Sequence, residues 1–455
     1  MQPEASSGSK PRRLTRSIYI AYGLPALPLA ALTVPVYIYI PPFYAQQLGL
    51  NLAAIGYALL FARIIDALSG PLVGVLSDSI HTRWGRRKPW IAIGTPLTLL
   101  TMVMLSIPLP GAGIGYLFFW SVALYFAIAA ISLPHTAWGA ELSGDYHERS
   151  DIVAWREALG LVGVILAMTL PFAVEKMGWV GAHPPLIAIV IVSGILLPAT
   201  IIMALRKAPE PPVLRFSQTG WREGMRVLKQ NRPFRMLVGA FLLNGIANSL
   251  PLTLFLLFVT HVLDSAANQG AFLLAYALAG ICAVPAWVAL SHRYNKHRVW
   301  VGSMFWASLI FVWVPLLGPE DFWWFMLISI LSGLSLGADI VLPTSMQADV
   351  VDADTLESGE QRTGLYFAMW GVATKLSTAG AIGIAFPLLD FIGFDAQSSA
   401  NSADALLGLA VLYGAIPVAF KLLATSMVWN FPIDANAQAE IRNEIERRAL
   451  SDHVV

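Results

Sequence analysis

The sequence carries unusually little charge. Only 13% of its 455 residues are Asp, Glu, Lys or Arg, whereas a soluble domain carries about 25%. Hydrophobic residues make up 56%, and the mean hydropathy is +0.64. So few charges cannot cover the water-facing surface of a protein of this length. We therefore expect lipid to surround most of the chain, and the composition excludes a string of soluble domains.

Several signatures of catalysis and metal binding are also missing. The single cysteine, Cys282, excludes an intramolecular disulfide. No Gly-x4-Gly-Lys-Ser/Thr loop occurs, which argues against a pump with its own ATPase. Gly333–Gly337 matches the Gly-x-Ser-x-Gly nucleophile pattern, but it lies inside an apolar segment without the strand–turn–helix context of a hydrolase. We therefore expect no enzyme, no metal, no cofactor and no nucleic-acid partner.

Long apolar segments dominate the chain instead. A helix needs about 20 mostly apolar residues to cross the hydrocarbon of a bilayer. Twelve segments meet this need, at 17–41, 51–76, 89–109, 114–138, 153–174, 183–205, 234–260, 269–291, 299–317, 321–345, 364–388 and 404–430. The first is far longer than the apolar core of a signal peptide, so we interpret it as a membrane span.

The distribution of Lys and Arg predicts the orientation. With both termini in the cytoplasm, 25 of the 29 basic residues fall on the cytoplasmic side and only Lys176 on the other. The remaining three, Arg63, Lys375 and Lys421, lie inside spans. This asymmetry predicts a multi-pass protein of the inner (plasma) membrane with cytoplasmic termini.

A long polar interruption divides the spans into two sets of six. The predicted domains are a first six-helix bundle at 1–205, a cytoplasmic linker at 206–233, a second six-helix bundle at 234–430 and a cytoplasmic tail at 431–455. Similar motifs recur at corresponding places in both halves, such as Leu133-Pro134 and Leu342-Pro343. Parallel repeats of this kind place a solute site between the halves near the midplane of the bilayer. We expect the chain to act as a monomer.

Three motifs, ordered along residues 66–375, resemble signatures of one transporter family. They are Asp66 with Arg83-Trp84-Gly85-Arg86-Arg87-Lys88-Pro89-Trp90, then Glu141, Glu148-Arg149 and Arg156, and then Asp349, Asp352, Arg362 and Lys375. They resemble the glycoside–pentoside–hexuronide:cation symporters, the melibiose-permease branch of the major facilitator superfamily. The resemblance implies an all-α membrane protein with twelve transmembrane helices, in the major facilitator fold of two six-helix bundles.

The sequence departs from the melibiose permease at positions that bind sugar or cation there. The second acid of span 2 is replaced by Gly70, two sugar-binding acids by Ala30 and Ser132, and the stacking indole by Thr136. The retained residues are Arg63, Asp66, Arg156 and Lys375. The resemblance therefore implies the fold and transport more strongly than a galactoside substrate or sodium coupling.

Asp66 is the leading candidate for cation coupling, together with Arg63 and Lys375. Ionisable groups inside a span are costly, so their default interpretation is functional. Desolvation favours the neutral form of an acid and a nearby cation favours the charged form, so a carboxylate between these influences can load and release a proton. Because Gly70 replaces the second acid, a sodium cage of several oxygens is disfavoured, and we expect H⁺ rather than Na⁺ coupling. The alternative is a static bridge between helices.

Other polar and aromatic side chains within the spans are candidates for binding the solute. Asn244 and Asn248, one helical turn apart, can present amides to a polar solute or join helices. Tyr366 and Trp370, at the same spacing, can stack on a sugar ring or simply pack. Asp339 is a candidate because it enters its span alone. The predicted binding set is Ser132, Thr136, Arg156, Asn244, Asn248, Asp339, Tyr366 and Trp370.

Charged residues at the cytoplasmic ends of the spans suit gating. Ion pairs between the two halves can hold the inner side shut, although each exposed pair contributes little by itself. The predicted gating set is Asp78, Arg83, Arg86, Arg87, Glu141, Glu148, Arg149, Asp349, Asp352 and Arg362.

The resulting prediction is a secondary symporter that moves a sugar, glycoside or related small polar solute with H⁺ or Na⁺ by alternating access. The alternative is a transporter or flippase of a lysolipid or another amphiphile, which the lost sugar-contacting positions favour. A third possibility is a membrane-embedded assembly or receptor protein without transport. In the first two cases the partners are a small-molecule substrate and the lipid bilayer.

Overall fold

The computed structural model describes residues 15–79, 82, 84–142, 146–179, 183–209, 226, 229–358, 363–398 and 400–452. The first bundle contains α1 (Arg16–Gly23), α2 (Ala26–Ile38), α3 (Ile40–Leu48), α4 (Leu52–Ser79), α5 (Lys88–Ser106), α6 (Ile114–Glu141), α7 (Tyr146–Lys176) and α8 (His183–Lys207). The second contains α10 (Arg232–His261), α11 (Gln269–Arg293), α12 (Lys296–Phe311), α13 (Phe322–Ser358), α14 (Thr363–Phe391) and α15 (Ala403–Val428). Two short 3₁₀ helices, η1 (Ala266–Asn268) and η2 (Val314–Leu316), and a final helix, α16 (Ala435–Asp452), complete the described chain.

The twelve-span prediction is confirmed. In the described parts of the chain, twelve helical segments are long and apolar enough to cross a membrane. The regular structure of these parts is helical apart from one isolated bridge between Thr82 and Gly85. In a bilayer this is expected, because a helix satisfies its backbone hydrogen bonds within a single segment.

The first span differs from the single segment predicted at 17–41. It is divided into α1, α2 and α3, with breaks at Leu24–Pro25 and at Tyr39. Pro25 has no N–H to donate into the helix, and its ring crowds the preceding turn. Pro41 follows the second break and lies at the start of α3, where its missing N–H costs nothing.

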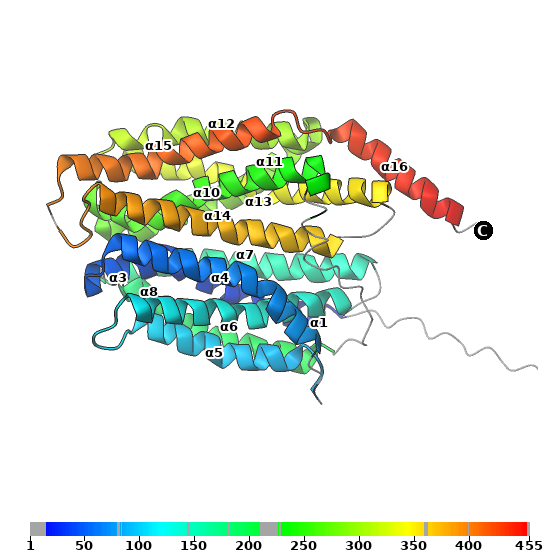
Figure 1. Cartoon of the computed structure of the whole chain (residues 1–455), viewed down its shortest axis with the longest axis horizontal. Helices are drawn as coiled ribbons and strands as arrows, with labels where there is room; N and C mark the ends of the chain where they lie inside the picture. Colours follow the sequence, from blue (N-terminus) through cyan, green and yellow to red (C-terminus); the bar gives the residue numbers. More distant parts are fainter. Residues whose placement is uncertain are drawn as a thin grey trace, which may run out of the picture.

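The two bundles lie side by side, and the axes of their spanning helices are roughly parallel or antiparallel to one another (Figure 1). Helix α4 packs against α14 across the boundary between them, and α7 packs against α11. We call the end that carries the loops at 107–113 and 317–321 the distal end. The opposite end, from which α16 projects, is the proximal end (Figure 1). Most of the predicted linker 206–233 lies outside the described residues, so the domain limits stay a prediction.

Candidate coupling site

Asp66 lies at the boundary between the two bundles and is shared by two cations. Arg63 Nη1, one turn earlier on α4, donates to Asp66 Oδ2 over 3.0 Å. Lys375 Nζ, from α14 of the other bundle, donates to Oδ1 over 2.7 Å and lies 3.3 Å from the Asp66 backbone oxygen. Asp66 is only 4% exposed, so this carboxylate depends on its two cations rather than on water.

Aromatic rings hold the guanidinium of Arg63 in place. Its Nη2 donates to the hydroxyl of Tyr37 on α2. Its Cζ lies 3.9 Å from the ring centroid of Tyr125 on α6 and 4.7 Å from that of Tyr37. Stacking on aromatic faces suits a weakly hydrated, planar guanidinium. Arg63 is therefore fixed within the first bundle, together with Asp66.

Lys375 differs from Arg63 because it reaches across the boundary and remains partly accessible. Its side chain is 29% exposed, against 9% for that of Arg63. A Cβ built on Gly70 would lie 3.9 Å from Lys375 Nζ. The ammonium thus lies beside the glycine that replaces the second acid, and it pairs with Asp66 alone among the described acids. Breaking this one pair would remove a direct ionic link between the bundles.

A second polar cluster lies entirely within the second bundle, around Asp339 of α13. Asn244 and Asn248 of α10 each donate an amide N–H to Asp339, both over 2.9 Å. Trp300 Nε1 of α12 donates to the same carboxylate over 2.8 Å. The expectation that Asp339 enters the membrane alone is therefore wrong. The two asparagines join helices α10 and α13, in agreement with the alternative interpretation of this pair.

Lys421 completes this cluster, and the sequence did not single it out as a site residue. Its Nζ donates to Asn244 Oδ1 over 2.8 Å and to Asn248 Oδ1 over 2.7 Å. It lies 3.7 Å from Asp339 Oδ2 and is 4% exposed. The available signal was a lysine inside a span, which by itself suggests a buried partner acid. Its partner lies 82 residues away along the chain, so spacing did not reveal the pair.

The indole hydrogen bond to Asp339 should have a measurable effect on stability. We expect Trp300→Phe to lower the free energy of unfolding by about 1–3 kcal/mol, because a buried carboxylate loses a donor. Thermal unfolding of purified protein in detergent would measure this. Trp306→Phe is the matched control, since its indole donates to the Leu331 carbonyl at an exposed position of the same helix. Equal shifts in both variants would contradict the prediction.

The remaining predicted binding residues lie in different surroundings. Thr136 is exposed on α6 and accepts from Arg156 Nη1 of α7 over 3.1 Å, and Ser132 is half-buried. Trp370 stacks on Phe241 with ring centroids 3.8 Å apart. Tyr366 is fully buried, packs edge-on against Phe234 and accepts a hydrogen bond from Asn231. In this conformation Tyr366 therefore has no face available for stacking on a solute.

Two of the described gating residues, Arg87 and Asp349, form hydrogen bonds within their own bundles. Arg87 donates to Ser77 Oγ over 3.2 Å. Asp349 accepts from Lys296 of its own bundle over 2.6 Å and 2.8 Å. Arg86, Glu148 and Asp352 are half-buried. Outside the described side chains lie Asp78, Arg83, Glu141, Arg149 and Arg362. Ion pairs between bundles stay a prediction for the opposite conformation.

At the distal end, by contrast, the two bundles are joined directly. Both carboxylate oxygens of Glu175, at the end of α7, accept from the backbone N–H of Gly270 at the start of α11, over 2.8 Å and 2.9 Å. A carboxylate at a helix N-terminus is also favoured by the helix dipole. Asn51 donates to Asp390, and Gln397 donates to the Gln46 carbonyl. We call these three contacts the distal seal.

The comparison with known families decides the class of this chain. A family model described as MFS/sugar transport protein matches residues 21–435. The chain belongs to this family of the major facilitator superfamily. The resemblance seen in the sequence is thereby confirmed, and so is the fold of two six-helix bundles.

The names of similar proteins refer to different kinds of solute. The chain is 24% identical to a glucuronide carrier protein homolog of Escherichia coli, over 89% of this chain and 90% of the relative. It is 23% identical to the sodium-dependent lysophosphatidylcholine symporter 1 of Gallus gallus, over 90% of this chain and 82% of the relative. The crystal structure of a bacterial homolog of the lysosomal transporter Spinster matches the fold with a TM-score of 0.66 at 12% identity, covering 94% of this chain and 97% of that chain.

Proposed function

We propose that the chain is a secondary active transporter that couples a small solute to a cation at Asp66 by alternating access. The observation that carries this proposal is the sharing of one buried carboxylate between Arg63 of its own helix and Lys375 of the opposite bundle. A cation that binds Asp66 must compete with Lys375. Cation binding would therefore weaken the link between the bundles, which is the step that alternating access requires.

A proton fits this site better than a sodium ion. Sodium needs several oxygen ligands, as hard cations do, and both oxygens of Asp66 already accept from a cationic side chain. Gly70 adds no further oxygen, and the neighbouring space holds the Lys375 ammonium. A proton needs only one carboxylate oxygen, so its arrival requires only that Lys375 withdraw.

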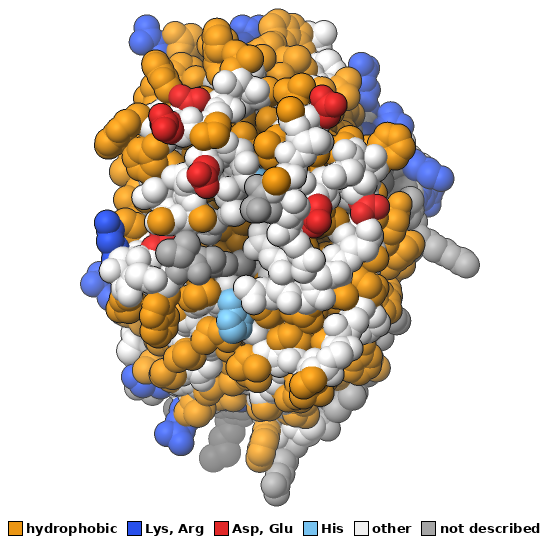
Figure 2. Space-filling view, turned by 90° about the vertical axis from the view of Figure 1, so that its left-hand side faces the viewer, with side chains coloured by type: hydrophobic (Ala, Val, Ile, Leu, Met, Phe, Trp, Pro, Cys, Tyr) orange, Lys and Arg blue, Asp and Glu red, His pale blue; other side chains and the backbone are white. Residues whose placement is uncertain are grey.

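We further propose that the termini are cytoplasmic and that the membrane is the plasma membrane. The distribution of basic residues supports this orientation. On the distal face, acidic side chains gather centrally and Lys and Arg lie at the edges (Figure 2). The distal end would then face outward, and the distal seal would close the outer side. One chain contains both bundles, so a monomer suffices for transport.

The solute that these residues suit best is a sugar, a glycoside or a sugar acid. Arg156 and Thr136 form a polar pair at a partly accessible position, and Lys375 contributes a second accessible cation. Arg recognises carboxylates well because its fork of donors matches their two oxygens. The relative named as a glucuronide carrier protein homolog supports the same class.

A lysolipid or a similar amphiphile is the second candidate. By the family resemblance, Ala30, Ser132 and Thr136 occupy positions where the melibiose permease has sugar-contacting side chains. Fewer side chains are therefore available here to contact a sugar. The lysophosphatidylcholine symporter of Gallus gallus is 23% identical to the chain, against 24% for the glucuronide carrier protein homolog. An anionic head group would meet the same two cations, Arg156 and Lys375, while its chain would lie among apolar helices.

Ligand-induced stabilisation in lipid nanodiscs would test the proposal. We expect 4-nitrophenyl β-D-glucuronide to raise the thermal unfolding midpoint, more strongly below neutral pH than above it, and without a requirement for Na⁺. Stabilisation by lysophosphatidylcholine alone would establish the second candidate. A requirement for Na⁺ would overturn proton coupling. Stabilisation by neither probe at any pH would contradict both solute classes.

A further inference from the structure

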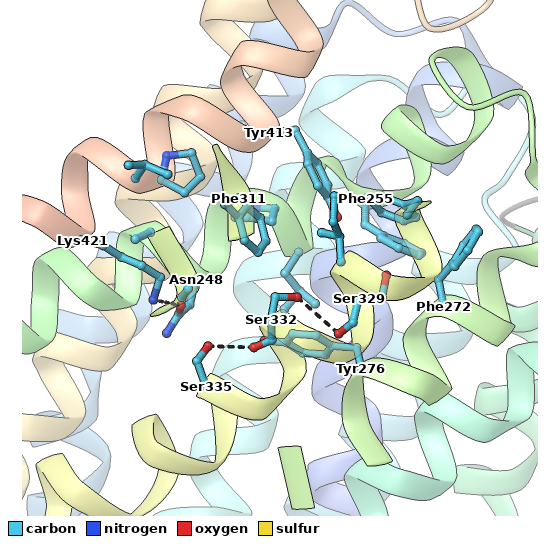
Figure 3. Close-up of a pocket in the computed structure, with 18 of the residues that line it drawn as sticks. Asn248, Phe255, Phe272, Tyr276, Phe311, Ser329, Ser332, Ser335, Tyr413 and Lys421 are labelled. Atoms are coloured by element: carbon cyan, nitrogen blue, oxygen red, sulfur yellow. Dashed lines mark hydrogen bonds between the residues drawn. The ribbon is translucent and has the colours of Figure 1, made fainter. Parts of the chain in front are cut away.

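A small cavity in the second bundle ends at the Asp339–Lys421 cluster. Its volume is about 60 Å³, and it lies among α10, α11, α12, α13 and α15. Lys421 and Asn248 line it at one side, and Ser329, Ser332 and Ser335 follow one another along α13 (Figure 3). Asp339 does not line it. Of the two charged groups in the cluster, only the lysine therefore borders the cavity.

The size and lining of the cavity indicate what it holds. About 60 Å³ is room for about two to four water molecules, and it is too small for a sugar or an acyl chain, since ligand pockets measure about 300–1,000 Å³. The hydroxyls of Tyr276 and Tyr413 border this space (Figure 3). Neither phenol finds a hydrogen-bond partner in the described part of the chain. A space with an ammonium, an amide and several hydroxyls is polar enough to be wet.

The hydrogen bonds of Lys421 leave one position for this water. An ammonium has three N–H donors. Two of them go to the carbonyl oxygens of Asn244 and Asn248. Asp339 Oδ2, at 3.7 Å, is beyond hydrogen-bond distance. Among the described groups, only cavity water is then left to accept the third N–H.

This arrangement is satisfied with or without the third proton. A neutral amine has two N–H groups, which match the two asparagine oxygens, and a lone pair, which can accept from the same cavity water. Asp339 keeps its three donors, Asn244, Asn248 and Trp300, in either case. Of the two charged groups in the cluster, only Lys421 borders the cavity. Lys421 is therefore the member that can exchange a proton with the cavity water.

No other charged group borders Lys421 among the described residues. The elements packed against α15 are α10, α12, α14 and η2. Helix α10 brings Asn244 and Asn248 to Lys421, Trp300 of α12 bonds to Asp339, and η2 is apolar. No described residue of α14 bonds to Lys421. Across the cluster, α13 brings Asp339. Apart from Lys421, the titratable groups that border the cavity are the phenols of Tyr276 on α11 and Tyr413 on α15 itself.

We propose that Lys421 is a second proton-exchange site of this transporter and that water in the serine-lined cavity serves it. In the exchange, the N–H bond that faces the cavity breaks and the electron pair stays on Nζ. The proton passes to a cavity water as hydronium and onward along neighbouring waters. On α13 the cavity runs from Ser335 to Phe325, about 15 Å of helix, toward the distal end. The role in a transport cycle rests on the proposed function, but the exchange itself does not.

Nitrogen NMR of the protein in lipid bilayers would test the exchange directly. The chain has eight lysines, and labelling their Nζ atoms with ¹⁵N distinguishes ammonium from amine by chemical shift. The Lys421 signal is assigned by its loss in Lys421→Arg, or in Lys421→Gln/Asp339→Asn if the first variant does not fold. We expect this signal to change from ammonium to amine at a lower pH than the signals of the exposed lysines do. An ammonium signal that persists until the exposed lysines titrate would overturn the proposal.

Transfer of magnetisation from water to Lys421 Nζ tests the cavity. We expect transfer in the wild type and a loss of at least half of it in Ser332→Val, which adds apolar bulk to the cavity. Ser308→Val is the matched control, because Ser308 is equally buried, donates to a helix carbonyl and lies outside the cavity. Absent transfer in the wild type, or equal transfer in both variants, would contradict the hydrated route. Asp66→Asn should leave the Lys421 titration unchanged. Proton exchange at Lys421 and cation coupling at Asp66 can therefore be contradicted independently of each other.

Discussion

Asp66→Asn is expected to abolish cation-driven accumulation of solute. An asparagine cannot bind and release a proton, so a gradient no longer does work on the solute. In a one-to-one proton symport, each pH unit supplies about 1.4 kcal/mol, or about a tenfold accumulation. In the variant, the ratio of inside to outside concentration should fall to about one. Proteoliposomes with an imposed pH gradient and radiolabelled 4-nitrophenyl β-D-glucuronide would measure it, with lysophosphatidylcholine as the parallel probe.

Two controls separate lost coupling from lost folding. Asp404→Asn makes the same change at an exposed position in the first turn of α15 and should leave accumulation intact. Asp66→Asn leaves Arg63 and Lys375 without their partner acid, and an unpaired buried charge costs about 3–5 kcal/mol. The double variant Asp66→Asn/Lys375→Gln removes one of these charges and should recover part of the thermal stability without recovering accumulation. Accumulation at the wild-type level in folded Asp66→Asn would contradict a coupling role.

Gly270→Ala is expected to open the distal seal. A Cβ at this position would lie 2.3 Å from Phe172 N and 2.5 Å from Phe172 Cα. These are backbone atoms and cannot turn aside as a flexible side chain can. The start of α11 must therefore move away from α7, and the Gly270 N–H is drawn from the Glu175 carboxylate. We expect the population to shift toward a state in which the distal ends of the bundles separate by several ångströms.

Distances between spin labels would report this shift. Labels at Leu109→Cys and Asp404→Cys mark the distal ends of the two bundles, in a background where Cys282 is replaced by serine. Gly302→Ala is the matched control, because a Cβ there meets no atom within 4 Å. A distance distribution in Gly270→Ala identical to that of Gly302→Ala would show that the seal tolerates the methyl group.

The sequence predicted the grouping of Arg63, Asp66 and Lys375 better than the contacts of the other candidate residues. Arg63 and Asp66 share one face of a helix at a spacing of three residues, and a charge inside a span indicates function on its own. Lys375 entered only through the family resemblance and its place in a span, since 309 residues separate it from Asp66. The structure brings all three side chains together.

The hydrogen bonds of the Asp339 cluster could not be predicted from the sequence. Asp339, Asn244, Asn248 and Lys421 lie on three helices, and Trp300 lies on a fourth. Nothing in the period of a single helix indicates which residues of different helices face one another. The sequence therefore placed Asp339 and the asparagines among the predicted solute-binding residues without indicating that they bond to one another. Similarly, hydropathy identified the first span but not its division at Pro25, because a hydropathy average does not register a missing N–H.

The distal seal also makes one surface of the molecule a composite of both bundles. Asn51 and Asp390 belong to different halves of the chain, as do Glu175 and Gly270, yet each pair is in direct contact at the distal end. An epitope that straddles this junction exists only while the halves are closed there. An antibody fragment selected against it would recognise a single conformation and, by mass action, arrest the protein in that conformation.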